Sequence, residues 1–389
     1  MSNSALRASL ARDFERFKRE LPRDFAAHVR NTYRIDLGAR YLGQALPHPV
    51  GKGSGQLSLN ANQLETDADA GLAFAVLKTV IAQDAAGARS MAAWAIHEAK
   101  MKVERRGAGW TVTWKGRGWD RSFDDYLALV RAGRDLTRAG RLLTIPSVKY
   151  HLPRLNEPFR SDEYAFTTRA LAQVWGGPPL LLEKDFSPTL AGDRLAEEKQ
   201  QILRWLREVP ACIRDHAEAR LAMKLMNARF DDDFQGVMVA AASGADALVV
   251  FNRLFDAEQR VAYGGPELSE RNLRVLGFPT PGASPGLSNT EGGRIELSGT
   301  GNICTGRLIV EYAIRGCASV QLHTFFQLPL EEYPATHGSR TQRALHALIF
   351  DPRDGLIAVL LEREAAGALE RRAGELHFLD LLPDAHRPR

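Results

Sequence analysis

The feature that most constrains the fold is a regular alternation of short apolar runs with helical patterns, which begins near residue 47. The runs are apolar at both odd and even positions, as expected of strands covered on both faces. A strand followed by a helix, repeated eight times, predicts a parallel sheet closed into a (β/α)8 TIM barrel, with an open doubly wound sheet as the alternative. The eight strand candidates are residues 49–55, 73–79, 142–150, 179–186, 220–226, 247–252, 294–299 and 318–324.

Helical patterns separate most of these runs. They cover residues 162–175, 194–216, 233–245 and 305–316. We expect the second of them to be interrupted near Pro210, because proline lacks a backbone N–H group and its ring crowds the preceding turn.

Two stretches depart from this alternation of strand and helix patterns. An insertion of about residues 84–135 follows the second strand, and its segment "GWTVTWKGRGWD" (109–120) predicts a hairpin, since Trp110 and Trp114 alternate with threonines. Residues 257–290 are rich in Gly and Pro, which predicts a lid or rim loop.

Three regions are expected along the chain. Residues 1–34 would form a helical cap broken at Pro22, residues 35–350 the barrel, and residues 351–389 an extension of helix and strand packed on its outside. The amphipathic N-terminal helices either cover the main domain or lie on a membrane surface, and the pattern leaves both open.

The charge distribution and the cysteine spacing exclude some classes of function. The net charge is +4, and basic residues interleave with acidic ones, as in "ARDFERFKRELPRDF", so no nucleic-acid partner is expected. The three cysteines show no C-x-x-C spacing, which excludes a cysteine-ligated iron–sulfur or zinc site within this chain and favours the cytoplasm. No metal site is predicted, and no apolar run approaches the ~20 residues of a membrane span.

Chemistry in a barrel of this kind sits at the carboxyl ends of the strands. The seventh strand ends in Gly299-Thr300-Gly301-Asn302, where glycines allow close approach and Asn302 tolerates a left-handed conformation. The eighth ends in His323-Thr324. Together these ends predict a phosphate site formed by two neighbouring loops.

Two lysines lie near strand ends among apolar residues. Lys78 stands in "AVLKT" and Lys224 in "LAMKLM". A lysine inside a barrel needs an acceptor or anion. It either forms an ion pair with a barrel carboxylate, such as Glu183 or Asp185, or holds electron-rich atoms of a phosphorylated cofactor.

The segments "LGQALPHPVGKGSGQ", "AFAVLKTV", "EKDFSPTLAG", "LAMKLM", "ALVVFN" and "SGTGNICTGRLIVEYAIRGCASVQLHT" occur in this order. Over about residues 35 to 330 they resemble the dihydroorotate dehydrogenase (DHODH) superfamily of FMN-dependent (β/α)8 barrels. The resemblance implies that Lys224 meets the N1/O2 edge of the flavin, where reduction places negative charge. It implies further cofactor contacts at Gly53, Ser54, Lys78, Thr79, Asn252, Thr300, Gly301, Asn302, His323 and Thr324.

The same resemblance implies catalytic roles. Ser187-Pro188 occupies the position of the family's catalytic Ser-Pro or Cys-Pro, so Ser187 would take a proton while hydride leaves for flavin N5. From its chemistry alone, Ser187 could instead cap a turn or helix. Asp185 is a competing base if the fourth strand is shifted by one residue.

The substrate pocket departs from the family pattern. Asn252 is retained as a candidate catalytic residue, but Lys184 and Thr189 stand where the family has asparagines that hold the ring. Lys184 is therefore a second candidate at the substrate, and with Trp114 and Trp119 it suggests a substrate with an anionic or aromatic group. We expect an FMN-dependent oxidoreductase acting on a C–C or C–N bond next to a carbonyl of a small molecule other than dihydroorotate. The alternatives are a true DHODH with an unusual pocket, a flavin-binding barrel without catalysis, and a sugar-phosphate barrel without flavin.

The resemblance leaves the partners open. The electron acceptor would be a quinone, a fumarate-like acid, NAD(P) through a partner, or oxygen. We expect a homodimer in the cytoplasm, with the N-terminal helices as the candidate for contact with a membrane surface.

Overall fold

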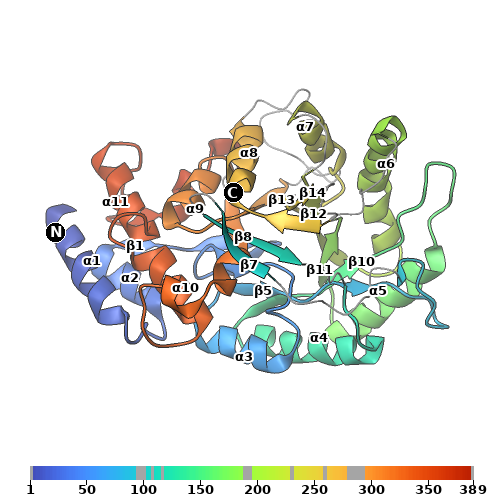
Figure 1. Cartoon of the computed structure of the whole chain (residues 1–389), viewed down its shortest axis with the longest axis horizontal. Coiled ribbons are helices and arrows are strands. Elements are labelled where there is room, and N and C mark those ends of the chain that lie inside the picture. Colours follow the sequence, from blue (N-terminus) through green and yellow to red (C-terminus); the bar gives the residue numbers. More distant parts are fainter. Residues whose placement is uncertain are drawn as a thin grey trace.

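The predicted strands form one parallel sheet that closes on itself (Figure 1). The computed structural model describes residues 3–92, 102–106, 109–114, 118–186, 195–227, 232–256, 261–277 and 294–386. The strand positions are, in chain order, β4 (Val50–Lys52), β5 (Phe74–Val76) with β6 (Val80–Ile81), β9 (Leu143–Ile145) with β10 (Ser147–Lys149), β11 (Leu180–Asp185), β12 (Ala219–Met226), β13 (Ala247–Asn252), β16 (Glu296–Thr300) and β17 (Cys317–Leu322).

Closure depends on the second and third positions, each of which is split into two short strands. Pro146 separates β9 from β10, because proline cannot donate to the ladder. β9 pairs with β5, whereas β10 pairs with β6 and β11. The order of paired strands therefore begins with β6, from the second position, and ends with β9, from the third. Since these two positions are neighbours, the sheet closes into a ring. The fold is therefore a TIM barrel, as the eight repeats predict.

Helices follow the strands and cover the barrel. They are α3 (Ala61–Asp69), α4 (Phe123–Arg138), α5 (Ser161–Trp175), α6 (Leu195–Arg214), α7 (Asp232–Ala241), α8 (Pro266–Gly277), α9 (Gly306–Ala313) and α10 (Arg340–Phe350). After β17 the short 3-10 helices η2 (Thr324–Gln327) and η3 (Leu330–Glu332) lead to α10. No described helix is long and apolar enough to cross a membrane.

Two helix expectations are wrong. Helix α6 runs through Pro210 without interruption. The proline ring is buried against α7's end, where a Cβ on Gly244 would lie 3.0 Å from it, so packing offsets the lost hydrogen bond. The segment predicted as a loop at 257–290 contains helix α8, and its residues 278–290 lie outside the described part of the chain.

Helices α1 (Asn3–Phe17) and α2 (Phe25–Tyr33), near the start of the chain, lie with α10 and α11 (Leu356–Ala365) on one side of the barrel (Figure 1). Helix α1 packs on α10 and on α11, and α2 leads into β1 (Ile35–Asp36), which pairs with β18 (Leu376–His377). The apolar face of α1 is thereby buried, which favours a cap over a membrane-surface helix. One continuous core joins cap, barrel and tail, and the boundaries at 34 and 350 stay a prediction.

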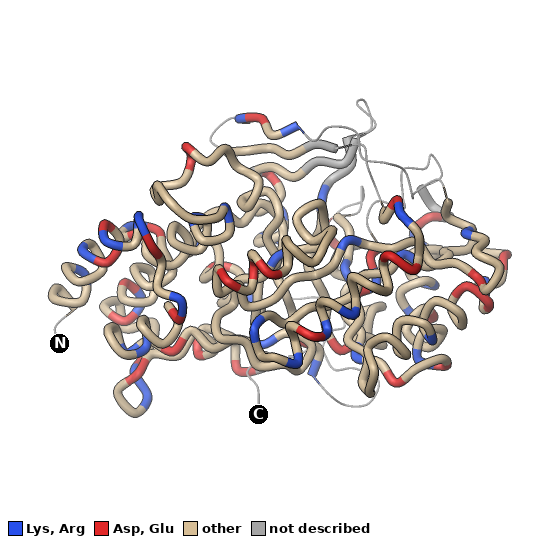
Figure 2. Tube along the Cα trace, turned by 90° about the horizontal axis from the view of Figure 1, so that it is seen from below, with Lys and Arg blue, Asp and Glu red and all other residues tan. Residues whose placement is uncertain are grey.

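Charged residues show no segregation along the chain. In Figure 2 the basic and acidic segments interleave over the described residues.

The insertion forms a roof with a distant loop. The hairpin consists of β7 (Lys102–Arg106) and β8 (Gly109–Trp114), so it begins before the predicted 109–120 segment. β8 pairs on its other side with β15 (Val261–Gly264), which pairs with β14 (Leu254–Asp256). Loops that leave the second and sixth strands thus form one four-stranded antiparallel sheet, and β8 packs on η2.

Gly306 permits a close contact between α9 and α11. A Cβ on this glycine would lie 2.1 Å from the backbone N of Leu356 and 2.4 Å from the carbonyl carbon of Gly355. We expect Gly306→Ala to lower the free energy of unfolding by about 2–3 kcal/mol, because backbone cannot move aside as a side chain can. Urea titration measures it, and Gly277→Ala is the control, since its Cβ would meet only Arg315 Nε at 3.7 Å. Equal stabilities of the two variants would contradict this close packing.

Candidate functional site

The candidate site is a pocket at the carboxyl ends of the barrel strands. Its lining comes from most of the strand ends: Gly53, Ser54, Gly55, Gln56, Lys78, Thr79, Asp185, Lys224, Asn252, Arg253, Thr300 and His323. The side chains in place leave a volume of about 40 Å³. Eight of the residues predicted to bind a cofactor therefore meet in one place, at the end of the barrel where such sites form.

Lys224 points into this pocket from β12, and an ion pair with Glu183, deeper in the barrel, holds its side chain. Its Nζ lies 3.6 Å from Glu183 Oε1, and both side chains are buried. Glu183 Oε2 accepts hydrogen bonds from Tyr41 Oη at 3.2 Å and from Gln321 Nε2 at 2.9 Å. The ion pair weighed from the sequence is thus present, and Lys224 also lines the pocket.

A second group of polar side chains, centred on Thr79, lies closer to the mouth of the barrel. Thr79 Oγ1 is 2.8 Å from Ser54 Oγ, 3.0 Å from Ser147 Oγ and 3.4 Å from Asp185 Oδ2. Lys149 Nζ lies 3.9 Å from the same carboxylate oxygen. Thr79 therefore links two serine hydroxyl groups, from the first and third strand positions, to one buried carboxylate.

The pocket has a lining rich in basic side chains. Its lining holds the cations Lys78, Lys224 and Arg253 against the carboxylate of Asp185. Burial, followed by Arg253, Lys78, Lys224 and Lys52, holds the pKa of His323 well below its ordinary range, so the imidazole is neutral. The mouth therefore favours a ligand with negative charge.

The turn after β16 has the predicted backbone. Asn302 has a φ of 52° and Gly301 a φ of 111°, both left-handed. Ser269 of α8 donates to the Gly301 carbonyl at 2.7 Å, and Asn272 donates to that of Thr300 at 2.6 Å. Helix α8 thus holds the turn in place.

Gly299 serves another purpose than the predicted close approach to a phosphate. A Cβ there would lie 2.4 Å from the ring of Tyr312, so this glycine makes room for packing of α9. Gly301, Asn302 and Thr324 do not line the described pocket, whereas Thr300 and His323 do. Thr324 lies below the roof, because a Cβ on Gly264 of β15 would be 3.4 Å from its Oγ1.

Lys184 is not brought into the site. It pairs in register with Val148 and Met223, whereas its neighbour Asp185 pairs with Lys224, which lines the pocket. Because successive side chains of a strand point to opposite faces, Lys184 stands on the face of the sheet away from the pocket. Its Nζ donates to the Asp185 carbonyl at 3.0 Å and lies 4.3 Å from the ring centre of Phe186. Burial, then Lys149, holds the pKa of Lys184 well below its ordinary range.

Other residues named from the sequence have separate outcomes. Trp119 is buried in the core against Tyr126, and its Nε1 donates to the Ser122 carbonyl at 2.8 Å, so it is no substrate contact. Ser187, Pro188 and Thr189 lie outside the described residues, as does the side chain of Trp114.

Sequence reasoning missed three lining residues, Gly55, Gln56 and Arg253. Arg253 follows Asn252 directly, and Gln56 follows the Gly53-Ser54-Gly55 turn. Taking each strand end in full and reading one residue beyond it would have found all three.

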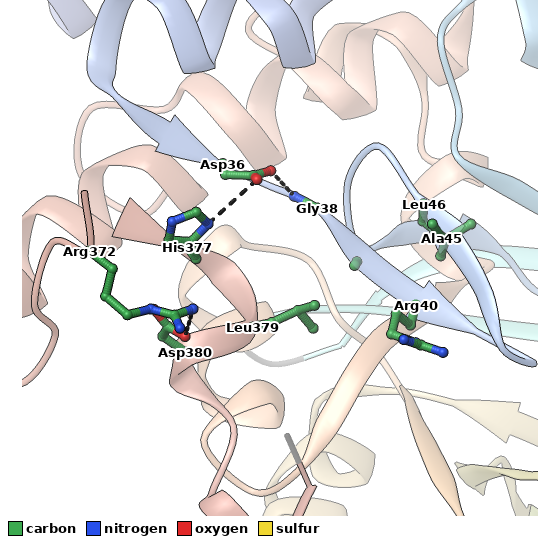
Figure 3. Close-up of a pocket in the computed structure, with 10 residues that line it drawn as sticks. Asp36, Gly38, Arg40, Ala45, Leu46, Arg372, His377, Leu379 and Asp380 are labelled. Carbon is green, nitrogen blue, oxygen red and sulfur yellow. Dashed lines mark hydrogen bonds and ion pairs between the residues drawn. The ribbon is translucent and has the colours of Figure 1, made fainter. Parts of the chain in front are cut away.

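A larger pocket lies at the opposite end of the barrel (Figure 3). Its volume is about 360 Å³, and it lies between the β1–β18 pair and the hairpin of β2 (Ala39–Tyr41) and β3 (Gln44–Leu46). Its charged groups pair locally: Asp36 with His377, Arg372 with Asp380, and Arg40 with Glu296. These pairs join the segment at residues 372–380 and the β2–β3 hairpin to the barrel floor, so the described charges of this pocket serve contacts within the fold.

The comparisons with known proteins place the fold. No protein-family model matches the chain, and no curated protein matches its sequence. Among solved structures, it is similar to DHODH from Eimeria tenella in complex with ferulenol, with a TM-score of 0.58 over 95% of this chain and 96% of that one. At 12% identity this likeness shows the fold alone.

The Glu183–Lys224 pair gives a stability prediction. We expect Lys224→Met to lower the free energy of unfolding by about 3 kcal/mol, because Glu183 would stay buried without a cation. A second change, Glu183→Gln, should restore most of that loss. Chemical denaturation of both variants measures it, with Lys18→Met at the exposed Lys18–Glu15 pair as a control expected to cost less than about 1 kcal/mol. A double variant no more stable than the single one would contradict the coupling.

Proposed function

We propose that this chain is an FMN-dependent oxidoreductase. It would move hydride between flavin N5 and a C–C or C–N bond next to a carbonyl of a small molecule. The observation that carries the proposal is the meeting of buried Lys78 and Lys224 with Thr79, Thr300 and His323 in one pocket at the carboxyl end of a TIM barrel. The likeness in fold to DHODH supports it.

The residues present fit the chemistry of FMN. An anionic ligand suits the three basic side chains of the lining, and Gln321 Oε1 is a buried acceptor with no hydrogen-bond partner among the described residues. Because the free volume is about 40 Å³, the long side chains of Gln56, Lys78 and Arg253 must change rotamer to admit a ring system. We assign the phosphate to the turn at Thr300–Asn302 and the start of η2.

When bound, FMN supplies the hydride acceptor, and the chain supplies charge and position. Glu183 keeps Lys224 at the mouth, where a fixed cation stabilises negative charge that develops on reduction. The roof formed by β7, β8, β14 and β15 would limit access of water to the site. Ser187 stays a predicted base, and a homodimer stays a predicted assembly.

The cofactor can be tested directly. We expect the purified protein to be yellow and to release one FMN per chain on denaturation. The stripped protein should bind FMN at least about 10-fold more tightly than riboflavin, because riboflavin lacks the phosphate that the turn binds. Fluorescence titration measures both. A colourless protein that takes up no FMN would contradict the proposal and favour a sugar-phosphate barrel.

Anaerobic mixing with dihydropyrimidines and related lactams then tests the substrate. We expect flavin bleaching by a member of this panel other than dihydroorotate, because the asparagines that the family uses at Lys184 and Thr189 are absent. Bleaching by dihydroorotate would favour a true DHODH with an unusual pocket. A protein that retains FMN but is bleached by no member of the panel would favour a barrel without catalysis.

A further inference from the structure

Asp185 is the one carboxylate among the residues that line the described pocket at the barrel mouth. Along β11, Glu183 faces inward and bonds to Gln321, so Asp185, two residues on, faces inward one layer closer to the mouth. Asp185 lines the pocket and is 7% exposed.

A chain of hydroxyl groups leads away from this carboxylate. Thr79 Oγ1 lies 3.4 Å from Asp185 Oδ2 and 2.8 Å from Ser54 Oγ. Asp185 and Thr79 are buried, whereas Ser54 is partly exposed. The chain therefore runs from the interior of the site to its solvent-accessible edge.

We propose that Asp185 accepts the proton released by the substrate and that Thr79 and Ser54 pass it to solvent. The inference rests on the proposed oxidoreductase function. The C–H bond next to the carbonyl breaks and its proton forms an O–H bond with Asp185, while the neighbouring carbon loses hydride, with two electrons, to the oxidised flavin. A double bond remains between the two carbons. Thr79 and Ser54 each accept one proton and give up another, so both end unchanged.

A carboxylate suits this role better than an unassisted serine. A carboxylate is ionised at neutral pH and can accept a proton directly, whereas a serine hydroxyl needs a neighbouring base to activate it. The rival explanation is a structural one, in which Asp185 only balances Lys149 at 3.9 Å. Lys149 does not line the pocket, whereas Asp185, Thr79 and Ser54 do, so an ion pair with Lys149 does not account for their place in the lining.

The first test uses holoenzyme without substrate. Infrared difference spectra between acid and neutral pH should contain the carbonyl stretch of a protonated carboxyl group, which Asp185→Asn removes. Thr79→Val should move this band to higher frequency, because the hydrogen bond is lost, whereas Thr79→Ser should leave it in place. Asp36→Asn, at the opposite end of the barrel, is the matched control. A band that Asp185→Asn leaves intact, or that Thr79→Val does not move, would overturn the proposal.

The second test measures anaerobic flavin bleaching with dihydroorotate, 5,6-dihydrouracil and the other panel members. Asp185→Asn should retain FMN and slow bleaching by ~10²-fold or more, the usual scale of a general base. Asp185→Glu should keep part of the rate, and it replaces Asp185→Asn if that variant fails to fold. Thr79→Val should change the pH profile of bleaching, and Thr79→Ser should restore it.

Ser187→Ala separates the two candidate bases. A Ser187→Ala variant that is inactive, beside an Asp185→Asn variant that bleaches at the wild-type rate, would overturn the proposal and return the role to Ser187. If no variant and no wild-type protein binds FMN, the oxidoreductase function fails. The infrared result on the protein without flavin then decides alone whether Asp185 exchanges protons through Thr79.

Discussion

One buried carboxylate links the floor of the barrel to its mouth. Glu183 is fully buried, accepts hydrogen bonds from Tyr41 of the floor hairpin and Gln321 of the eighth strand, and forms an ion pair with Lys224 of the fifth. A buried ion is stable only when such partners surround it, so the three elements must be in place together. The pKa of Tyr41, raised well above its ordinary range first by burial and then by Glu183, reflects the same crowding. Lys224 belongs to this network and also lines the pocket, so the contacts that stabilise the fold fix the position of its ammonium group.

The roof shows how insertions acquire structure. Neither the loop after the second strand nor the loop after the sixth could form a stable sheet as a lone hairpin. Paired edge to edge through β8 and β15, they make four strands, and β8 packs on η2 beside the turn at Thr300–Asn302. Helix α8, which follows β15, then holds that turn through Ser269 and Asn272. The roof and the turn are therefore coupled, and a change in either is expected to reach the other.

Most of the fold could be predicted because strands buried on both faces leave a strong local signal. All eight strand candidates overlap observed strands, and the left-handed Asn302 follows from the side chain's own preference. The errors have identifiable causes. The hairpin partner of residues 109–114 precedes them and carries charged residues, and Pro210 is accommodated by a contact with Gly244 that no local pattern encodes.

The sequence by itself determined the barrel, the order of its elements and the residue types at its mouth, because periodicity and turn chemistry are local properties of the chain. It could not determine which of Lys184 and Asp185 faces the interior. Both stand near the end of one strand, and a shift of one residue exchanges the two faces. Only pairing with β10 and β12 fixes that parity, and it places the carboxylate in the pocket and the lysine behind it. The union of two distant loops into a roof was likewise decided by tertiary structure, since edge pairing depends on where the barrel brings the loops together.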